Sequence, residues 1–381
     1  MALTLDELTV DPHPHLHRLR REQPVAWIDS LAGWLVTSHQ ICVEVMLDLE
    51  TFTVDDPRFS TSRVIGPSML SLDGLEHRRH RDPFAGPFRP GKIQQLEEEI
   101  EGEARRLVSR VAADGGGDLR STVAAPLAAT VMAGLLDMTD VPVSDVLAWY
   151  DEIVDAVHTV TAGGEVPGSA LSAFDELKQA VAGNLSSSDL LSVVDASGTL
   201  TVDEIVSNVA VLLFGGIVTS ESSTAIAYRY LLDDPDLHRA IRRDRSLVAP
   251  FVEETLRLEP SASAVDRYAT SDTVLGGVRV TEGDLVRVSL SAANRDPTVF
   301  PDPDDLAIGR SNLGRSVTFA RGPHACLGVH LARLETVAAV GALLGHPEQP
   351  VAGGLDPITG LVFRVPETVD AAWQRPGDAV N

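Results

Sequence analysis

One cysteine lies in a segment whose residue types suit the ligation of a metal. Residues 319–328 read Phe-Ala-Arg-Gly-Pro-His-Ala-Cys-Leu-Gly, and Cys326 is the thiol. Gly322 and Pro323 predict a tight loop, and leucines at helical spacing predict a helix directly after it. Free amide donors and the macrodipole at a helix N-terminus lower the pKa of a thiol. Such a thiolate is a strong axial ligand for haem iron. A buried cysteine without a chemical role is the alternative for a lone residue.

A carboxylate and a guanidinium stand one helical turn apart in an apolar segment. Glu254 and Arg257 are spaced i, i+3, which places them on one helical face, and Phe251, Val252 and Leu256 surround them. An exposed pair of this kind contributes little to stability. A buried pair needs further partners, because an unpaired buried ion costs several kcal/mol.

A basic run offers cations that suit an anionic ligand. Residues 76–81 read Glu-His-Arg-Arg-His-Arg, and His77 and Arg81 share a helical face at i, i+4. The forked donors of an arginine match a carboxylate. A solvated helix face is the alternative interpretation.

The most apolar part of the chain contains a pair of glycines. Residues 209–232 predict a long helix that crosses the core. We expect Gly215 and Gly216 to interrupt this helix, because they weaken it and let the backbone open into a groove. The Thr219 hydroxyl can reach the carbonyl of Gly215, which favours such a distortion. Close helix packing through small residues is the alternative.

Helices must position most of these residues. The pattern is mainly helical over residues 93–244, and a final helix is expected over 327–344. Short strands are predicted at 25–28 and 34–37, at 274–275 and 278–280, and at 285–290. Prolines and aspartates make residues 296–305 irregular. The predicted fold class is mainly α with small β-sheets.

Composition limits the setting in which the protein works. The 381 residues contain no linker, so we expect a single domain over residues 1–381. With 31 basic and 55 acidic residues, the net charge of −24 disfavours nucleic acid as a partner. The N-terminus lacks a secretory pattern, and the apolar run 209–218 is shorter than the about 20 residues that span a bilayer. Two separated cysteines fit a reducing cytoplasm. We expect a cytoplasmic protein that binds no membrane.

The cysteine segment resembles the signature of the cytochrome P-450 family, Phe-Gly-x-Gly-x-His/Arg-x-Cys-x-Gly. The matching residues are Phe319, Gly322, His324, Cys326 and Gly328. Ala320 departs from the pattern, which has glycine there. The resemblance covers nearly the whole chain, with four motifs in the same order. It implies a triangular helical prism that encloses haem b (iron protoporphyrin IX), with Cys326 as the proximal ligand to the iron.

The resemblance also assigns roles to the charged residues. Glu254 and Arg257 match the family's buried Glu-x-x-Arg pair, and Arg310 is the candidate third member, with a structural role. The candidate partners of the haem propionates are His77, Arg81, Arg267 and His324.

The family's distal motif, small-Gly-x-acid-Thr, is matched by Gly215, Gly216 and Thr219 but has Val218 at the acidic position. In the family this acid and threonine help to deliver protons during oxygen activation, and a valine carries no proton. Glu221, at i+3 from Val218, is the candidate substitute. Uncoupled oxygen activation, substrate-assisted proton delivery, use of peroxide and an introduced mutation all remain open as explanations.

The reaction implied by the resemblance is a monooxygenation. One oxygen atom of O2 enters a hydrophobic small molecule, in natural-product metabolism, with electrons from NAD(P)H through ferredoxin reductase and ferredoxin. Val218 supports an alternative haem-thiolate reaction, a peroxygenation or an oxidative coupling; a non-catalytic haem protein is the third hypothesis. We expect a monomer. The substrate pocket is expected to include Phe214, Ile217, Val218, Ala262 and Val265, under a lid at residues 153–174 with hinges at Gly163-Gly164 and at Pro167-Gly168.

Overall fold

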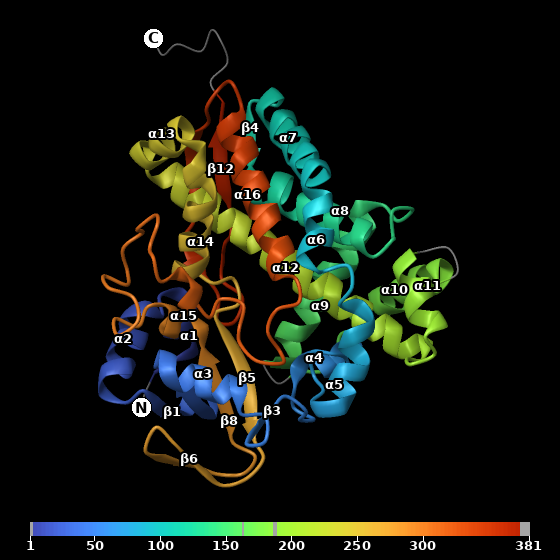
Figure 1. Cartoon of the computed structure of the whole chain (residues 1–381), viewed down its shortest axis with the longest axis vertical. Helices are drawn as coiled ribbons and strands as arrows, with labels where there is room; N and C mark the ends of the chain where they lie inside the picture. The colour runs from blue at the N-terminus through green and yellow to red at the C-terminus, as the bar shows by residue number, and fades with distance from the viewer. Residues whose placement is uncertain (1–2, 162–163, 186–188, 374–381) are drawn as a thin grey trace. The chain divides into compact units, whose positions relative to one another are not determined.

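Most of the chain is helical, with short strands near both ends, as the periodicity predicts (Figure 1). The computed structural model describes residues 3–161, 164–185 and 189–373. The chain divides into two compact units. The first unit comprises Met1–Phe52, Leu96–Leu127 and Thr219–Asn381, and the second comprises Thr53–Gln95 and Ala128–Val218.

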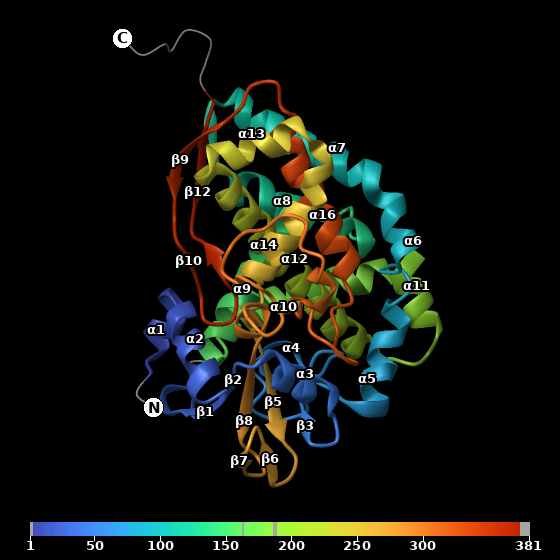
Figure 2. The same ribbon diagram turned by 60° about the vertical axis from the view of Figure 1, so that its left-hand side comes forward.

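Eight α-helices of the described residues belong to the first unit alone. They are α1 (Leu5–Val10), α2 (His13–Glu22), α3 (His39–Leu47), α7 (Glu97–Ala113), α13 (Pro235–Arg243), α14 (Val248–Leu258), α15 (Leu290–Asn294) and α16 (Val329–Gly345). Helices α7 and α16 lie side by side in both ribbon views (Figures 1 and 2). The final helix begins close to the predicted position, directly after the cysteine segment.

The second unit is built from helices. They are α4 (Ser60–Ile65), α5 (Gly74–Arg81), α6 (Pro90–Ile93), α9 (Val143–Thr161), α10 (Gly168–Asn184) and α11 (Asp189–Ala196). Two helices continue from one unit into the other, α8 (Ala125–Leu135) and α12 (Val202–Asp233). Of the two expected lid hinges, the second lies at the start of α10, where Pro167 is the N-cap and Gly168 the first helical residue. In the first hinge, Gly164 precedes α10, and Gly163 lies outside the described residues.

A five-stranded sheet has the order β1-β2-β8-β5-β3. Its strands are β1 (Val25–Ile28), β2 (Gly33–Val36), β8 (Leu285–Ser289), β5 (Ala264–Ala269) and β3 (Phe52–Thr53). The remaining strands are β4 (Gly116–Asp118), β12 (Val369–Ala372) and β9 (Val351–Leu355) in one sheet, β6 (Thr273–Leu275) with β7 (Val278–Val280), and β10 (Ile358–Thr359) with β11 (Val365–Pro366). The predicted β1–β2 and β6–β7 pairs are confirmed, and both are antiparallel.

A buried apolar cluster joins this sheet to the cysteine segment. Val36, Val286 and Val288 of the sheet pack with Met46 of α3 and with Val317, and Ala320 packs against the same cluster. The start of the cysteine segment is therefore fixed by the core of the first unit.

The prediction that two glycines interrupt the long apolar helix is wrong. Helix α12 is continuous α-helix from Val202 to Asp233, and it begins earlier than expected. A glycine costs roughly 1 kcal/mol in a helix interior, and burial of the apolar side chains around Gly215 and Gly216 outweighs this cost. Helix α12 is also long and apolar enough to cross a membrane. The sequence had suggested the opposite, because the apolar run 209–218 alone is too short to span a bilayer. However, 67% of its most apolar window is buried inside the protein, as in the core helix of a globular fold.

Candidate active site

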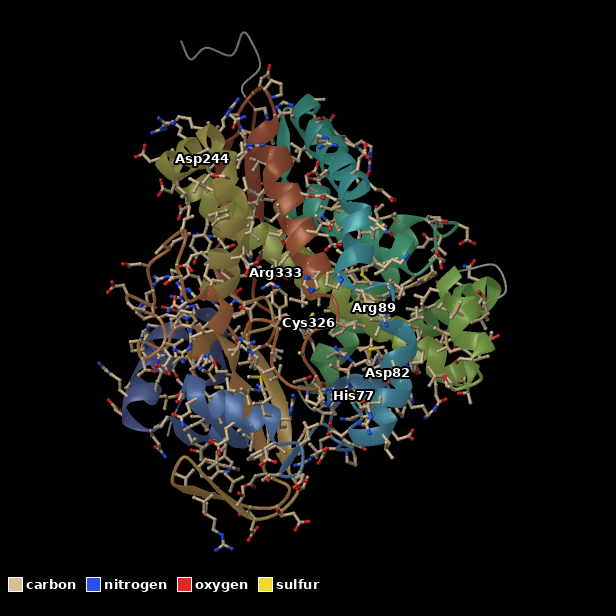
Figure 3. All side chains as sticks on the ribbon, viewed as in Figure 1. His77, Asp82, Arg89, Asp244, Cys326 and Arg333 are labelled. Atoms are coloured by element: carbon tan, nitrogen blue, oxygen red, sulfur yellow. The ribbon has the colours of Figure 1, made fainter. Side chains whose placement is uncertain are left out.

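Cys326 lies in the loop that leads into α16, with its thiol exposed (Figure 3). Two backbone hydrogen bonds shape this loop: the Cys326 N–H donates to the Phe319 carbonyl at 2.9 Å, and the Ala325 N–H donates to the Gly322 carbonyl at 3.0 Å. Gly328 is the N-cap of α16. The thiol is thus presented two residues before the N-cap of the helix, where the amide donors of the first turn favour a thiolate.

Both the backbone angle and the surroundings at position 322 require a glycine. Its φ of +77° lies in the left-handed region, and a Cβ there would stand 2.7 Å from the Met46 carbonyl oxygen. Ala320 has φ +55°, so the position that departs from the family pattern also adopts a left-handed conformation. An L-residue pays about 1–2 kcal/mol for this conformation, which is the physical reason for a glycine in the pattern.

We expect Ala320→Gly to stabilise the protein by about 1 kcal/mol or less, because the relief of backbone strain exceeds the added entropy of the unfolded chain. Urea denaturation measures the change. Ala325→Gly in the same loop is the control, because Ala325 is not among the residues with positive φ and gains no relief. Equal losses of stability in the two variants would contradict the strain at Ala320.

Arg333 connects the loop to two helices, and its role was not predicted. Its guanidinium lies over the Phe319 ring, 4.8 Å from the centroid, and its Nε donates to Glu253 Oε1 of α14 at 2.5 Å. A cation over an aromatic face is attracted by the ring quadrupole. Phe319 is therefore fixed against α16, and the loop is tied to α14.

Glu254, Arg257 and Arg310 form a buried charge cluster. The guanidinium of Arg257 donates to both oxygens of Glu254, at 2.8 and 2.7 Å, and Arg310 Nε donates to Glu254 Oε1 at 2.6 Å. The Glu254 and Arg257 side chains are fully buried. Burial raises the pKa of Glu254, but the hydrogen bonds from Arg257, the Ala307 N–H and Arg310 outweigh it, so the pKa is lowered. Arg257 also donates to the carbonyls of Asn294 and Pro303, which fixes the irregular segment before the cysteine loop.

The candidate propionate partners occur in both units. In the first unit, Arg267 is buried on β5 and donates from Nη1 to the Asp266 carbonyl, and His324 is partly exposed in the cysteine loop. In the second unit, His77 is buried on α5 and Arg81 is half-buried at the end of that helix.

The two glycines of α12 differ in their surroundings. A Cβ at Gly216 would clash with the Met132 side chain of α8, whereas a Cβ at Gly215 would have no heavy atom within 4 Å. Gly215 is exposed although residues 209–214 are buried. Gly216 therefore permits close helix packing, and Gly215 leaves one face of the helix open. Val218 is buried.

Two contacts hold the following turn of α12 in place. The Ser261 hydroxyl donates to the Thr219 carbonyl at 3.0 Å. The Glu221 carboxylate accepts from Arg120 Nε at 2.6 Å, and its side chain is 6% exposed. The candidate substitute for the missing acid is thus ion-paired. No motif had singled out Ser261 or Arg120.

The proposed pocket residues are apolar and mostly buried. Phe214 and Ile217 are buried on α12, whereas Ala262 and Val265 of the first unit are partly exposed. Ala262 forms an isolated bridge with Phe363.

A buried polar group that the motifs missed organises the second unit. Asn208 of α12 accepts from the Met69 N–H at 2.9 Å, donates to the Glu204 carbonyl, and contacts His80 Nδ1 at 2.9 Å. Burial, the largest cause, lowers the pKa of His80. The segment around Met69 is therefore anchored on α12. The polar side chain of Asn208 in an otherwise apolar stretch of the sequence is the signal that could have indicated this contact.

The donor set suits a haem held by one thiolate. Among the described residues, no three His, Cys, Asp or Glu side chains gather as a metal site. The described residues therefore provide no metal site with several protein ligands. They do provide an exposed thiol beside a helix N-terminus, together with buried cations. A porphyrin supplies the other ligands of its own iron, and its carboxylates require cations, so these residues fit the group.

Comparisons with known proteins agree with this chemistry. The sequence profile of the cytochrome P450 family matches residues 184–348. Cytochrome P450 107B1 of Saccharopolyspora erythraea is 32% identical over 89% of this chain and 88% of its own length. The vitamin D(3) 25-hydroxylase of Pseudonocardia autotrophica is also 32% identical, over 93% of this chain and 90% of its own length. The solved P450 enzyme CxnD, described as acting in C–S bond formation in chuangxinmycin biosynthesis, has a TM-score of 0.84 and 25% identity over 96% of each chain. The chain therefore belongs to the cytochrome P450 family and is a P450 monooxygenase, an oxidoreductase of the haem-thiolate class.

Proposed function

We propose that this enzyme inserts one oxygen atom from O2 into a hydrophobic small molecule, with electrons from NAD(P)H delivered by ferredoxin reductase and ferredoxin. The observation that carries the proposal is the exposed Cys326 thiol in a rigid loop before α16. The bound haem supplies activation of dioxygen and transfer of one oxygen atom to a C–H or double bond.

Cys326 is the proposed iron ligand, and Phe319, Gly322 and Gly328 give its loop the required shape. The proposed propionate partners are Arg267 and His324 in the first unit and His77 and Arg81 in the second. Each offers N–H donors, and the guanidinium groups are always charged. Glu254, Arg257 and Arg310 hold the backbone that carries the cysteine loop and have no direct chemical role.

On the distal helix, Thr219 is the proposed hydroxyl that orients water and passes protons. The Ser261 hydroxyl holds the Thr219 carbonyl, which favours one orientation of this turn. Gly215 leaves space on the face of α12 one turn before Thr219. Val218 holds no proton, and the Glu221 carboxylate is engaged by the Arg120 guanidinium. We therefore favour an anchoring role for Glu221 over replacement of the acid.

A second candidate function follows from Val218. Without the distal acid, a peroxide-driven oxygenation demands less of proton delivery from α12, because hydrogen peroxide brings its own protons; an oxidative coupling is the other form of this candidate. CxnD, described as acting in C–S bond formation, shows that this fold supports reactions other than the insertion of oxygen. We keep the dioxygen route first because Gly215, Gly216 and Thr219 retain the rest of the distal motif.

We propose a hydrophobic substrate from secondary metabolism. The proposed lining residues Phe214, Ile217, Ala262 and Val265 are apolar, and one relative is a vitamin D(3) hydroxylase. We also propose a cytoplasmic monomer in which both units fold as one domain, since α12 continues from one unit into the other without a break.

Val218→Glu is expected to raise the yield of product per NAD(P)H consumed by about tenfold. A carboxyl restored before Thr219 supplies a general acid, and such groups typically contribute 10²–10⁴-fold when fully effective. The measurement is the ratio of product to NAD(P)H with an excess of ferredoxin and reductase. Val218→Gln, which has similar size and polarity but no acidic proton, is the control. An unchanged ratio in Val218→Glu would count against a proton-delivery defect.

A further inference from the structure

One loop of the second unit is attached to α12 by a side-chain hydrogen bond that the proposed mechanism does not use. Residues 66–72, called the Met69 loop below, lie between α4 and α5. The Ser68 N–H donates to Ser71 Oγ at 3.1 Å, and the Ser71 N–H donates to the Ser68 carbonyl at 3.0 Å. The Met69 N–H donates to Asn208 Oδ1 of α12 at 2.9 Å. The loop is therefore a compact turn that Asn208 holds against the helix.

Asn208 lies on the face of α12 that Gly215 leaves open. Gly215 follows Asn208 by two helical turns, and a Cβ at Gly215 would have no heavy atom within 4 Å. The Asn208 side chain is fully buried, and Met69 is buried as well. The Met69 loop therefore covers α12 two turns before the open part of this face, at the end of the proposed substrate pocket.

The partners of the Asn208 amide determine which nitrogen of the His80 ring carries a hydrogen. Oδ1 accepts from the Met69 N–H, and Nδ2 donates to the Glu204 carbonyl at 2.7 Å. One partner is a donor and the other an acceptor, so they allow a single orientation of the amide. In this orientation Nδ2 also donates to His80 Nδ1, 2.9 Å away. His80 Nδ1 is therefore an acceptor, and Nε2 carries the ring proton.

The other side of the His80 ring faces charged groups. Arg79 Nη2 lies 3.1 Å from His80 Nε2, but it donates to Glu204 Oε1 at 2.6 Å and pairs with Glu76 Oε2 at 2.7 Å. Its hydrogens thus point at carboxylates, and Glu204 Oε1 stands 3.5 Å from Nε2. Burial, the largest cause, and Arg79 lower the pKa of His80, and they outweigh Glu204 and Glu76, which raise it. These surroundings favour the neutral ring.

We propose that His80 is a pH-dependent switch of the substrate pocket: the neutral ring holds the Asn208 amide and the Met69 loop in place, and the protonated ring releases them. A second ring proton, taken from solvent, binds to Nδ1, so that two donors then face each other. Rotation of the amide relieves this conflict, but it turns the NH2 group toward the Met69 N–H and breaks that hydrogen bond.

His80 acts through Asn208 and is therefore a positioning residue. The inference deepens the proposed function and rests on it, because the pocket beside this face of α12 is itself proposed. Its consequence is that the affinity for a hydrophobic substrate falls in acid, as the fraction of molecules with a closed loop falls.

The first test reads the ring proton and needs no turnover. Nitrogen NMR of the holoenzyme with isotope-labelled histidines, reduced and bound to carbon monoxide, should show His80 with its proton on Nε2 at neutral pH. Loss of the signals in His80→Asn identifies them. Asn208→Asp puts a carboxylate oxygen opposite Nδ1, so it should place a proton on Nδ1 and raise the pKa of His80. A proton on Nδ1 in the wild type, or none on Nδ1 in Asn208→Asp, would overturn the proposal.

The second test follows the loop by hydrogen exchange. Protection of the Met69 amide, corrected for the intrinsic pH dependence of exchange, should fall by about tenfold per pH unit below the pKa of His80. His80→Asn should keep the protection constant, because its carboxamide oxygen takes the place of Nδ1 and gains no proton. Since the folded pKa lies below the unfolded value of 6.5, the stability of the wild type relative to His80→Asn should also fall as the pH drops below 6.5.

His238→Asn is the matched control for hydrogen exchange. His238 is also buried, burial lowers the pKa of its ring too, and its Nε2 contacts Gln349 of the first unit. This variant should show the same acid loss of Met69 protection as the wild type. Protection that does not depend on pH in the wild type, or the same acid loss in His80→Asn, would contradict a switch at His80.

The third test connects the loop to the pocket. The dissociation constant of a fluorogenic aryl ether, measured by equilibrium dialysis, should rise about tenfold where the pH leaves a tenth of the wild-type molecules with a closed loop. His80→Asn should bind the ether equally at this pH and at neutral pH. An unchanged constant in the wild type, while the Met69 amide is released, would overturn the role of His80 in the pocket. Absence of binding at neutral pH, with the amide protected, would instead contradict the proposed hydrophobic pocket.

Discussion

Cys326→Ser is expected to abolish the thiolate absorption band that the reduced enzyme gives with carbon monoxide, together with all monooxygenase activity. A serine hydroxyl keeps its proton at neutral pH, so it cannot replace the anionic sulfur ligand. The loop itself should persist, because its shape depends on backbone hydrogen bonds and on Gly322, which the substitution leaves unchanged. The spectrum, the haem content and product formation are measured on the same preparation.

The second cysteine gives a matched control. Cys42 is buried under the five-stranded sheet, and burial raises the pKa of its thiol. Cys42→Ser should keep the thiolate band and lose only stability, because a hydroxyl replaces a thiol in an apolar cluster. An intact band in Cys326→Ser, or its loss in Cys42→Ser alone, would show that Cys326 is not the ligand.

Arg257→Met is expected to destabilise the protein by about 3–5 kcal/mol, the usual cost of removing one partner of a buried ion pair. The substitution leaves the Glu254 carboxylate buried without its bidentate partner, and only Arg310 and the Ala307 N–H remain against it. It also removes the donors to the Asn294 and Pro303 carbonyls. Urea denaturation at neutral pH measures the difference in the free energy of unfolding.

Two comparisons separate the buried pair from ordinary surface charge. Arg279→Met removes an exposed partner of Asp272 and should cost less than about 1 kcal/mol. Adding Glu254→Gln to Arg257→Met should recover part of the loss, since the fully buried carboxylate no longer lacks its main partner. A cost for Arg257→Met as small as that for Arg279→Met would contradict a structural role for the cluster.

The parts of the site that rest on short sequence spacing could be predicted. The cysteine loop depends on glycine, proline and the start of a helix within ten residues, and all of these are local features. The Glu254–Arg257 spacing likewise places both ions on one face before any tertiary contact is known. Arg310 required the family pattern, because its contact with Glu254 joins segments that are distant in sequence.

The parts that depend on tertiary packing could not be predicted. Local propensity suggested a break at Gly215 and Gly216, but packing keeps α12 regular. Glu221 was predicted to replace the missing acid because of its helical spacing from Val218. Its ion pair with Arg120 could not be predicted, since it joins residues far apart in the chain. Glu335 of α16 interrupts an apolar stripe, which is a visible signal, but its full burial is a property of the folded interior alone.

The most direct measurement of the central claim compares two oxidants on one preparation of the wild-type enzyme. A fluorogenic aryl ether is offered either with NAD(P)H, ferredoxin reductase and ferredoxin or with hydrogen peroxide alone, and the initial rates of product formation are measured. We expect faster turnover with the redox partners, because Thr219 and the remaining distal motif still support activation of dioxygen. Faster turnover with peroxide would contradict the dioxygen route and favour the peroxide-driven or coupling reaction that Val218 suggests.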